Sequence, residues 1–214
     1  MKVILFGGSG LVGTSILRNL LDKTEITKVQ VVLRRSLGLN HEKLDELIQT
    51  DLSPQFIKNL DIEANIVVCA LGTTIAQAGS KQNFKAVDFD LSYATAELSK
   101  KLQAKFILVS AAGADSNSFI FYNRIKGQLE EAVMRLKLNS LVIYRPSLLI
   151  GERSEKRTAE RLGVAAYKVL KPILPKSLRS YLGTEVEVLA KHVVENIIQG
   201  ETEEKILNPS LIRL

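Results

Sequence analysis

Three side chains in the middle of the chain have the types and spacing needed to deliver a proton to a carbonyl. Tyr122 and Lys126 are four residues apart, which puts both on one face of a helix. A tyrosine, with a reference pKa of about 10, needs a nearby positive charge to act as acid or base at neutral pH. Ser110, twelve residues earlier, would hold the carbonyl. Together these three side chains predict carbonyl reduction by hydride transfer. The alternative interpretation is a surface tyrosine with an unrelated lysine.

A glycine-rich segment near the N-terminus has the spacing of a phosphate-binding turn. Glycines stand at positions 7, 10 and 13, after the apolar run Lys2–Phe6 and before a segment of helical periodicity. Such glycines permit a tight turn, close approach to a pyrophosphate and close helix packing, and the helix N-terminus attracts phosphate. This predicts a nicotinamide dinucleotide site, with a ligand-free turn as the alternative. The predicted contacts are Gly7, Ser9, Gly10, Leu11, Val12 and Gly13.

Two arginines, Arg34 and Arg35, follow the second apolar run, Lys28–Leu33. Sites that prefer NAD place an acidic residue about 20 residues after the glycines, where it binds the ribose 2′-hydroxyl. Guanidinium groups suit a 2′-phosphate instead. The predicted cofactor is therefore NADP(H), and a solvated basic turn is the alternative reading of the arginines.

Two further strand ends supply predicted cofactor contacts. Asp51 and Leu52 follow the third strand, where the Asp51 carboxylate would accept a hydrogen bond from the adenine amino group; a turn or helix N-cap role suits it equally. The segment that closes the fourth strand contains small residues, which let the backbone pass close to a ribose. Its predicted contacts are Ala70, Leu71, Gly72 and Thr73.

Apolar runs alternate with segments of helical periodicity, the pattern of βα units around a parallel sheet. We therefore expect an α/β, Rossmann-type doubly wound, mostly parallel sheet with helices on both faces. The expected strands are 2–6, 28–33, 46–50, 66–71, 106–110, 141–145, 185–188 and 205–207, and the helices follow Gly13 or span 88–102, 122–136 and 190–199.

The composition of the sequence changes after Gly151, where charged residues are followed by a mixture of apolar and basic ones. Residues 152–185 are expected to form a small helical cap over the carboxyl edge of the sheet, so that 1–214 make a single domain. Within this cap Arg153 and Arg157 either attract an anionic group of the substrate or belong to a solvated, charged loop. Apolar residues at helical spacing over 162–173 favour packing on the sheet edge or on a second subunit over contact with a membrane.

The amino-acid composition favours some classes of binding partner and disfavours others. The 214 residues carry a formal net charge of +6, which suits an anionic cofactor or substrate, while the absence of tryptophan and 6% aromatics disfavour nucleic-acid binding. The one cysteine, Cys69, lies in an apolar run and is expected to pack in the core, and two distant histidines make no metal cluster. Glycines interrupt the only signal-like apolar run, and no stretch is long enough to span a bilayer, so a cytoplasmic location is expected.

Several motifs in order give the chain a family resemblance. They are GGSGLVG at 7–13, LRR at 33–35, CALGTT at 69–74, AVDFDL at 86–91, LVSAAGAD at 108–115, FYNRIKG at 121–127 and RPSLLIGER at 145–153. With these the chain resembles an atypical branch of the short-chain dehydrogenase/reductase superfamily. It is most similar to the Tat-interacting-protein type of small NADPH-binding oxidoreductase and its bacterial relatives.

The resemblance implies a Rossmann fold, NADP(H) and a catalytic set of Ser110, Tyr122 and Lys126. It also implies that Pro146, Ser147 and Leu148 lie beside the nicotinamide. One departure stands out, because many members have an asparagine that relays protons near the place where this chain has Asp88.

The leading hypothesis is an NADP(H)-dependent oxidoreductase for a small carbonyl or alcohol substrate. Its rival is a non-catalytic NADPH-binding sensor or regulatory protein that acts through a protein partner or as a homodimer. A nucleotide-sugar epimerase or dehydratase shares the catalytic set but needs a larger C-terminal domain than the roughly 60 residues after Gly151 allow.

Overall fold

A single parallel sheet forms the centre of the molecule. The computed structural model describes residues 1–151, 183–200 and 204–212. Its main sheet has seven strands in the order β3-β2-β1-β4-β5-β6-β9, and every pairing is parallel. The strands are β1 Lys2–Phe6, β2 Lys28–Leu33, β3 Leu44–Ile48, β4 Ile66–Cys69, β5 Lys105–Val109, β6 Leu141–Tyr144 and β9 Glu204–Leu207.

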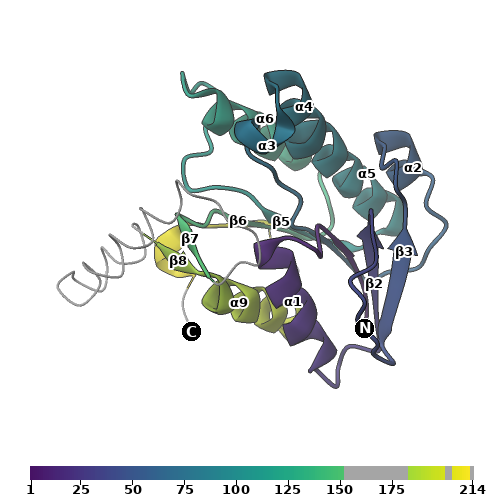
Figure 1. Ribbon diagram of the computed structural model, residues 1–214. Helices are drawn as coiled ribbons and strands as arrows, with labels where there is room; N and C mark the ends of the chain where they lie inside the picture. The colour runs from purple at the N-terminus through teal and green to yellow at the C-terminus, as the bar shows by residue number, and fades with distance from the viewer. Residues whose placement is uncertain (152–182, 201–203, 213–214) are drawn as a thin grey trace.

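Helices cover both faces of this sheet (Figure 1). One face carries α1 (Leu11–Leu21) and α9 (Val186–Gln199), and the other carries α2 (Pro54–Lys58), α5 (Ser92–Leu102) and α6 (Phe121–Arg135). The expected Rossmann-type fold class is therefore confirmed. The smaller elements are α3 (Ile75–Ala78), α4 (Lys81–Lys85), the π-helix η1 (Ala86–Leu91), the 3₁₀-helix η2 (Pro209–Leu211), and the parallel pair β7 (Leu149–Ile150) and β8 (Thr184–Glu185).

Side chains of each central strand alternate between two hydrophobic cores. In β1, Val3 and Leu5 join the core under α1 and α9, whereas Ile4 and Phe6 join the core under α2, α5 and α6. Burial on both faces explains why this strand is apolar at consecutive positions. Cys69 is fully buried in the second core, as its apolar surroundings predict.

Several element boundaries differ from the sequence-based expectation. The third strand lies at Leu44–Ile48 and not at 46–50. The strand expected at 185–188 is wrong beyond Glu185, because Val186 already begins α9. Apolar residues at 186, 189, 190, 193 and 194 follow the helical period, which outweighs the β propensity of the valines.

The predicted cap over 152–185 lies outside the described residues except at its C-terminal end. There Thr184 and Glu185 form β8 and pair with Leu149 and Ile150. Arg153, Arg157 and the apolar face over 162–173 also lie outside the described residues.

A histidine beneath the sheet makes stability depend on pH. The Tyr144 hydroxyl lies 3.1 Å from Nδ1 of His192 on α9. Burial lowers the pKa of His192, more than attraction to Glu195 raises it, so the folded state favours the neutral ring. The unfolded state takes up this proton first, at about pH 6.5 and below, and stability falls as pH decreases through that value.

We therefore expect the free energy of unfolding to fall between about pH 7.5 and pH 5.5, and the fall to be smaller in a His192→Gln variant. Urea unfolding at both pH values measures it. His41→Gln, at a half-buried position outside both cores, is the control and should keep the wild-type fall. An equal fall in His192→Gln and wild type would contradict the assignment.

Candidate functional site

In the glycine-rich turn between β1 and α1, a side chain at Gly7 or Gly13 would clash with backbone atoms. Gly7 has a φ of +86°, and a Cβ there would lie 2.4 Å from the carbonyl oxygen of Ala70. A Cβ on Gly13 would lie 2.1 Å from the Gly7 carbonyl oxygen. The Gly10 amide donates to that same carbonyl at 2.9 Å. The turn is thus held against the end of β4, where the strand order of the sheet reverses and ligands of such folds bind.

The N-terminus of α1 has the properties of an anion site. Its N-cap, Gly10, offers no side-chain hydrogen bond, and the first turn contains no acidic residue. The first amides, at Leu11–Gly13, have no acceptor within the helix, and the helix dipole adds positive potential. Ser9 and Gly10 are exposed to solvent. A negatively charged group is therefore favoured at this end of the helix.

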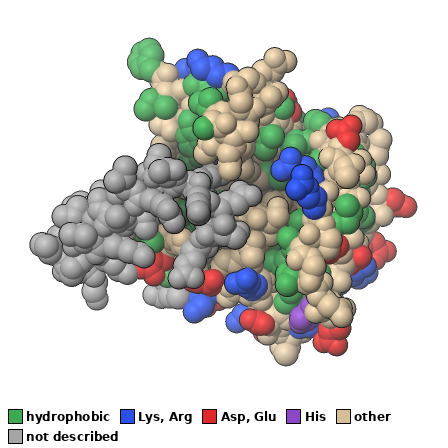
Figure 2. All heavy atoms as spheres, viewed as in Figure 1, with side chains coloured by type: hydrophobic (Ala, Val, Ile, Leu, Met, Phe, Trp, Pro, Cys, Tyr) green, Lys and Arg blue, Asp and Glu red, His purple; other side chains and the backbone are tan. Residues whose placement is uncertain are grey.

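Arg34 and Arg35 follow the carboxyl end of β2, beside the end of β1 that carries the turn. Both are exposed, and neither forms an ion pair with any residue that the structure describes. Lys and Arg side chains are exposed at several places on the face drawn in Figure 2, in keeping with the net charge of +6. Two guanidinium groups without an ion-pair partner among the described residues thus lie at the carboxyl edge of the sheet.

The segment after β3 bears on one of the roles considered for Asp51, that of a helix N-cap. Asp51 is exposed, and Leu52 is partly buried against the second core. The N-cap of α2 is Ser53, whose hydroxyl accepts a hydrogen bond from the Phe56 amide at 3.2 Å. The N-cap role considered for Asp51 is therefore wrong, and its carboxylate faces solvent.

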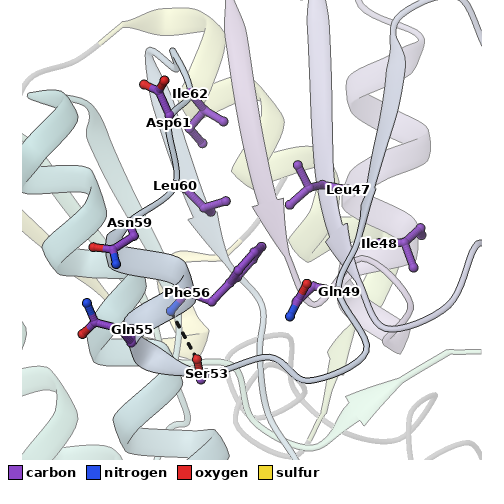
Figure 3. A pocket seen from close by; sticks show the side chains of 10 residues that line it. All are labelled: Leu47, Ile48, Gln49, Ser53, Gln55, Phe56, Asn59, Leu60, Asp61 and Ile62. Carbon is purple, nitrogen blue, oxygen red and sulfur yellow. Dashed lines mark hydrogen bonds between the residues drawn. The ribbon is translucent and has the colours of Figure 1, made fainter.

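A pocket of about 560 Å³ lies between β3 and α2 (Figure 3). Leu47, Phe56 and Leu60 point into it, and polar side chains border it. Its lining residues are Leu47, Ile48, Gln49, Ser53, Gln55, Phe56, Asn59, Leu60, Asp61 and Ile62. None of the predicted site residues is among them.

Lys126 on α6 is joined to the end of β4 through Asp88. The Lys126 Nζ lies 2.7 Å from Oδ1 of Asp88, and both side chains are almost completely buried, at 3% and 0% exposure. The other oxygen of Asp88 accepts a hydrogen bond from the Thr73 amide at 2.8 Å. A Cβ added to Gly72 would lie 3.9 Å from the Lys126 Nζ. The structure therefore brings Lys126, Gly72 and Thr73 together.

Opposing effects determine the charge of Lys126. Burial lowers the pKa of the ammonium, but attraction to Asp88, with smaller contributions from Tyr122 and Cys69, outweighs it and raises the pKa. Lys126 thus stays protonated at neutral pH although it is buried.

Tyr122 lies one helical turn before Lys126 and is half-buried. Its ring packs against Phe84 of α4, with centroids 5.6 Å apart and planes tilted by 51°. This contact orients the ring without using the hydroxyl group.

The Ser110 hydroxyl already has an acceptor. Ser110 is buried at the end of β5 and donates to Oε1 of Glu130 on α6. Glu130 is itself buried and paired with Arg145, whose Nε lies 3.0 Å and 3.1 Å from its two carboxylate oxygens. In this arrangement the Ser110 oxygen can accept a hydrogen bond but has no proton to offer. Among the described residues, neither this hydrogen bond nor the ring contact of Tyr122 joins Ser110 to Tyr122.

The segment after β6 is held by the strand pair beyond it. The buried Pro146 accepts a hydrogen bond from the Ala112 amide at 2.9 Å. Ser147 donates its amide to the Thr184 hydroxyl at 3.0 Å, and the Leu148 carbonyl accepts from the Thr184 amide at 2.8 Å. Residues 146–148 are thus fixed next to the loop that follows Ser110.

Sequence reasoning missed Glu130, Arg145 and Thr184. Glu130 follows Lys126 by four residues, so the helical spacing that links Tyr122 to Lys126 also predicts Glu130 on that face. Arg145 and Thr184 are distant in sequence from their partners, and no local pattern reveals them.

Two features are absent from the described ranges, a metal-binding cluster and a membrane-spanning helix. Within 1–151, 183–200 and 204–212, no group of three or more His, Cys, Asp and Glu side chains suits a metal ion. Among the same residues, none of the helices has the length and apolar character needed for a bilayer span.

Solved structures share this fold. The oxidoreductase ylbE from Lactococcus lactis superposes with a TM-score of 0.65 at 16% identity, covering 96% of this chain and 89% of that one. The Bordetella bronchiseptica enzyme WbmH, solved in complex with NAD⁺, gives a TM-score of 0.71 at 15% identity and covers 97% of this chain and 75% of its own. At such low identity these likenesses show the fold alone.

Curated relatives contradict the expected cytoplasmic location. Protein FMP52, mitochondrial, from Lodderomyces elongisporus is 32% identical over 98% of this chain and 93% of its own length. Further relatives carry the same mitochondrial name. The cytoplasmic expectation is therefore wrong; it rested on the lack of a secretory signal and a bilayer span, which does not distinguish cytoplasm from organelle.

These matches also decide the family. The HIM1 family model matches residues 28–177, which is more than half of the chain. The likeness to the Tat-interacting-protein type stays a prediction. With the fold, the relatives and the family model in agreement, the chain belongs to the HIM1 family.

Proposed function

We propose that this protein is an NADP(H)-dependent oxidoreductase that reduces a carbonyl group of a small substrate or oxidises the corresponding alcohol. The observation that carries the proposal is the glycine-rich turn, which is held against Ala70 at the uncapped N-terminus of α1. The structural relative WbmH was solved with NAD⁺, which supports a nicotinamide dinucleotide.

The residues of the turn fit a dinucleotide, because a side chain at Gly7 or Gly13 would clash with the backbone and the helix amides are uncapped. When bound, the dinucleotide would supply or accept a hydride. The turn would hold its pyrophosphate, and Arg34 and Arg35 its 2′-phosphate. The remaining predicted contacts are Asp51 and Leu52 for adenine, Ala70, Leu71, Gly72, Thr73 and Lys126 for ribose, and Pro146, Ser147 and Leu148 for nicotinamide.

The protein's own groups would handle the proton. Tyr122 would donate its hydroxyl proton to the carbonyl oxygen during reduction and take it back during oxidation. Lys126, charged and one turn away, would stabilise the resulting phenolate and bind ribose hydroxyls. Ser110 would accept a hydrogen bond from the substrate alcohol or from Tyr122, because its own proton is donated to Glu130.

The preference for NADP(H) is tested by removing the two arginines. We expect an Arg34→Ala/Arg35→Ala variant to bind NADPH about 10- to 100-fold more weakly, since a hydrogen bond to a charged group contributes about 1.5–3 kcal/mol. NADH, which lacks the 2′-phosphate, should bind as it does to the wild type. Fluorescence titration with both dinucleotides measures this. Arg18→Ala, an exposed arginine in the last turn of α1, is the matched control. Equal wild-type affinities for NADPH and NADH would refute the preference.

A second candidate function is a protein that binds NADPH and transmits its binding to a partner. The engagement of the Ser110 hydroxyl with Glu130 favours it, because the predicted carbonyl holder then lacks a free proton. A panel of carbonyl compounds with NADPH separates the candidates. Turnover of any compound supports the oxidoreductase, and NADPH binding without turnover of the whole panel supports the sensor.

A further inference from the structure

Asp88 is a completely buried carboxylate with a different partner at each oxygen. One oxygen pairs with the Lys126 ammonium at 2.7 Å, and the other accepts the Thr73 amide at 2.8 Å. Lys126 belongs to α6, and Thr73 to the loop after β4. A single side chain therefore connects two segments of the proposed dinucleotide site that are far apart in sequence.

An irregular helical turn brings Asp88 to this position. Residues Lys81–Leu102 are helical throughout, but Ala86–Leu91 form the π-helix η1 between α4 and α5. The Ser92 hydroxyl donates to the carbonyl of Val87, five residues earlier, at 3.2 Å. Single π-turns within α-helices are uncommon and are frequent at functional sites. The wider turn aims Asp88 at Lys126, whereas Asp90 in the same turn is exposed.

The surroundings of Lys126 show what Asp88 contributes. Among the described residues, the groups that raise the pKa of the ammonium are Asp88 from η1, Tyr122 from α6 and Cys69 from β4. Burial alone lowers the pKa of Lys126, and Asp88 contributes most to the opposing effect that raises it. A buried lysine without its carboxylate tends to lose its proton.

We propose that Asp88 is a positioning residue that holds the Lys126 ammonium and the Thr73 amide in one arrangement ready for the ribose of a dinucleotide. The proposal rests on the proposed function, because it assigns a role within that binding site. The task assigned to Asp88 is to keep Lys126 charged through their ion pair.

The test is the affinity for NADPH as a function of pH. In an Asp88→Asn variant the amide oxygen can still accept from Thr73, but the ion pair is lost. We expect the dissociation constant to rise about tenfold at pH 7, as for loss of one charged contact. Its ratio to the wild-type value should grow further towards about pH 9, because Lys126 then loses its proton. Asp90→Asn removes an exposed acid from the same turn and should keep the ratio near one.

The outcomes separate this proposal from the proposed function. If the wild type does not bind NADPH, both fail. If the wild type binds and Asp88→Asn has the wild-type affinity at every pH, only the role of Asp88 fails. Should Asp88→Asn not fold, Asp88→Asn/Lys126→Met removes both charges and should restore folding. That double variant should bind NADPH weakly with no added pH dependence, and wild-type affinity in it would overturn the proposal.

Discussion

A Tyr122→Phe variant is expected to bind NADPH with wild-type affinity and to reduce carbonyl substrates about 10²- to 10⁴-fold more slowly, the usual contribution of a positioned acid or base. The change removes only the hydroxyl, and the phenyl ring keeps its contact with Phe84, 5.6 Å away. The ion pair of Lys126 with Asp88 does not involve the tyrosine, so the site should stay assembled.

The measurement is NADPH oxidation with the first carbonyl compound that the wild type turns over, together with NADPH titration and thermal unfolding. Tyr93→Phe is the matched control, since this tyrosine of α5 stacks on Phe89 and lies outside the proposed site. Undiminished turnover in Tyr122→Phe would remove the tyrosine from the proposed chemistry and leave the binding site untouched.

The second large effect is expected at Gly7. An alanine there must adopt a φ of +86° and place its Cβ 2.4 Å from the Ala70 carbonyl oxygen. The left-handed conformation costs about 1–2 kcal/mol, and overpacking typically costs a further 1–3 kcal/mol or so. We therefore expect Gly7→Ala to lower the free energy of unfolding by about 2–5 kcal/mol and to abolish dinucleotide binding.

Substitutions at two other glycines, Gly38 and Gly10, separate the conformational cost at Gly7 from the steric clash. Gly38 has a φ of +66° but open space around it, so Gly38→Ala should show the conformational cost alone and bind NADPH normally. A Cβ on Gly10 would approach the Gly7 carbonyl oxygen only to 3.2 Å, so Gly10→Ala should fold. It should still weaken NADPH binding by about tenfold or more, because the added methyl group would face the pyrophosphate of a dinucleotide bound as proposed. A Gly7→Ala variant no less stable than Gly38→Ala would contradict the described geometry.

Local patterns were enough to predict the sheet. The strands at 2–6 and 28–33 have the predicted boundaries, because their side chains are mostly apolar and buried, with Lys2, Lys28 and Gln30 as the exceptions. The predicted position of the third strand is two residues too far along the chain. The reason is that β3 lies at the edge of the sheet and its side chains are only partly buried. Without continuous burial, the sequence of an edge strand carries a weaker period, and its ends are harder to place.

The candidate site was predictable where chemistry and spacing coincide. The turn at 7–13 and the pair of Tyr122 and Lys126 are local patterns, and the structure shows their geometry. The partners of Lys126 and Ser110 were not predictable, because Asp88 and Glu130 reach them through tertiary contacts. The π-turn was not predictable from the sequence either, because one wide turn barely alters the 3.6-residue helical period over a long segment.

The order of strands in the sheet also determines when the protein can fold during its synthesis. Val3 pairs with both Val29 and Ile66, so β1 stays without its second neighbour until more than 60 further residues have left the ribosome. In the same way, β6 cannot pair with β9 until Glu204, the partner of Leu141, has been synthesised. Such distant parallel pairings close slowly and leave apolar strand edges open to other chains in the meantime. The nascent polypeptide is therefore expected to need chaperone protection before its last strand has been made.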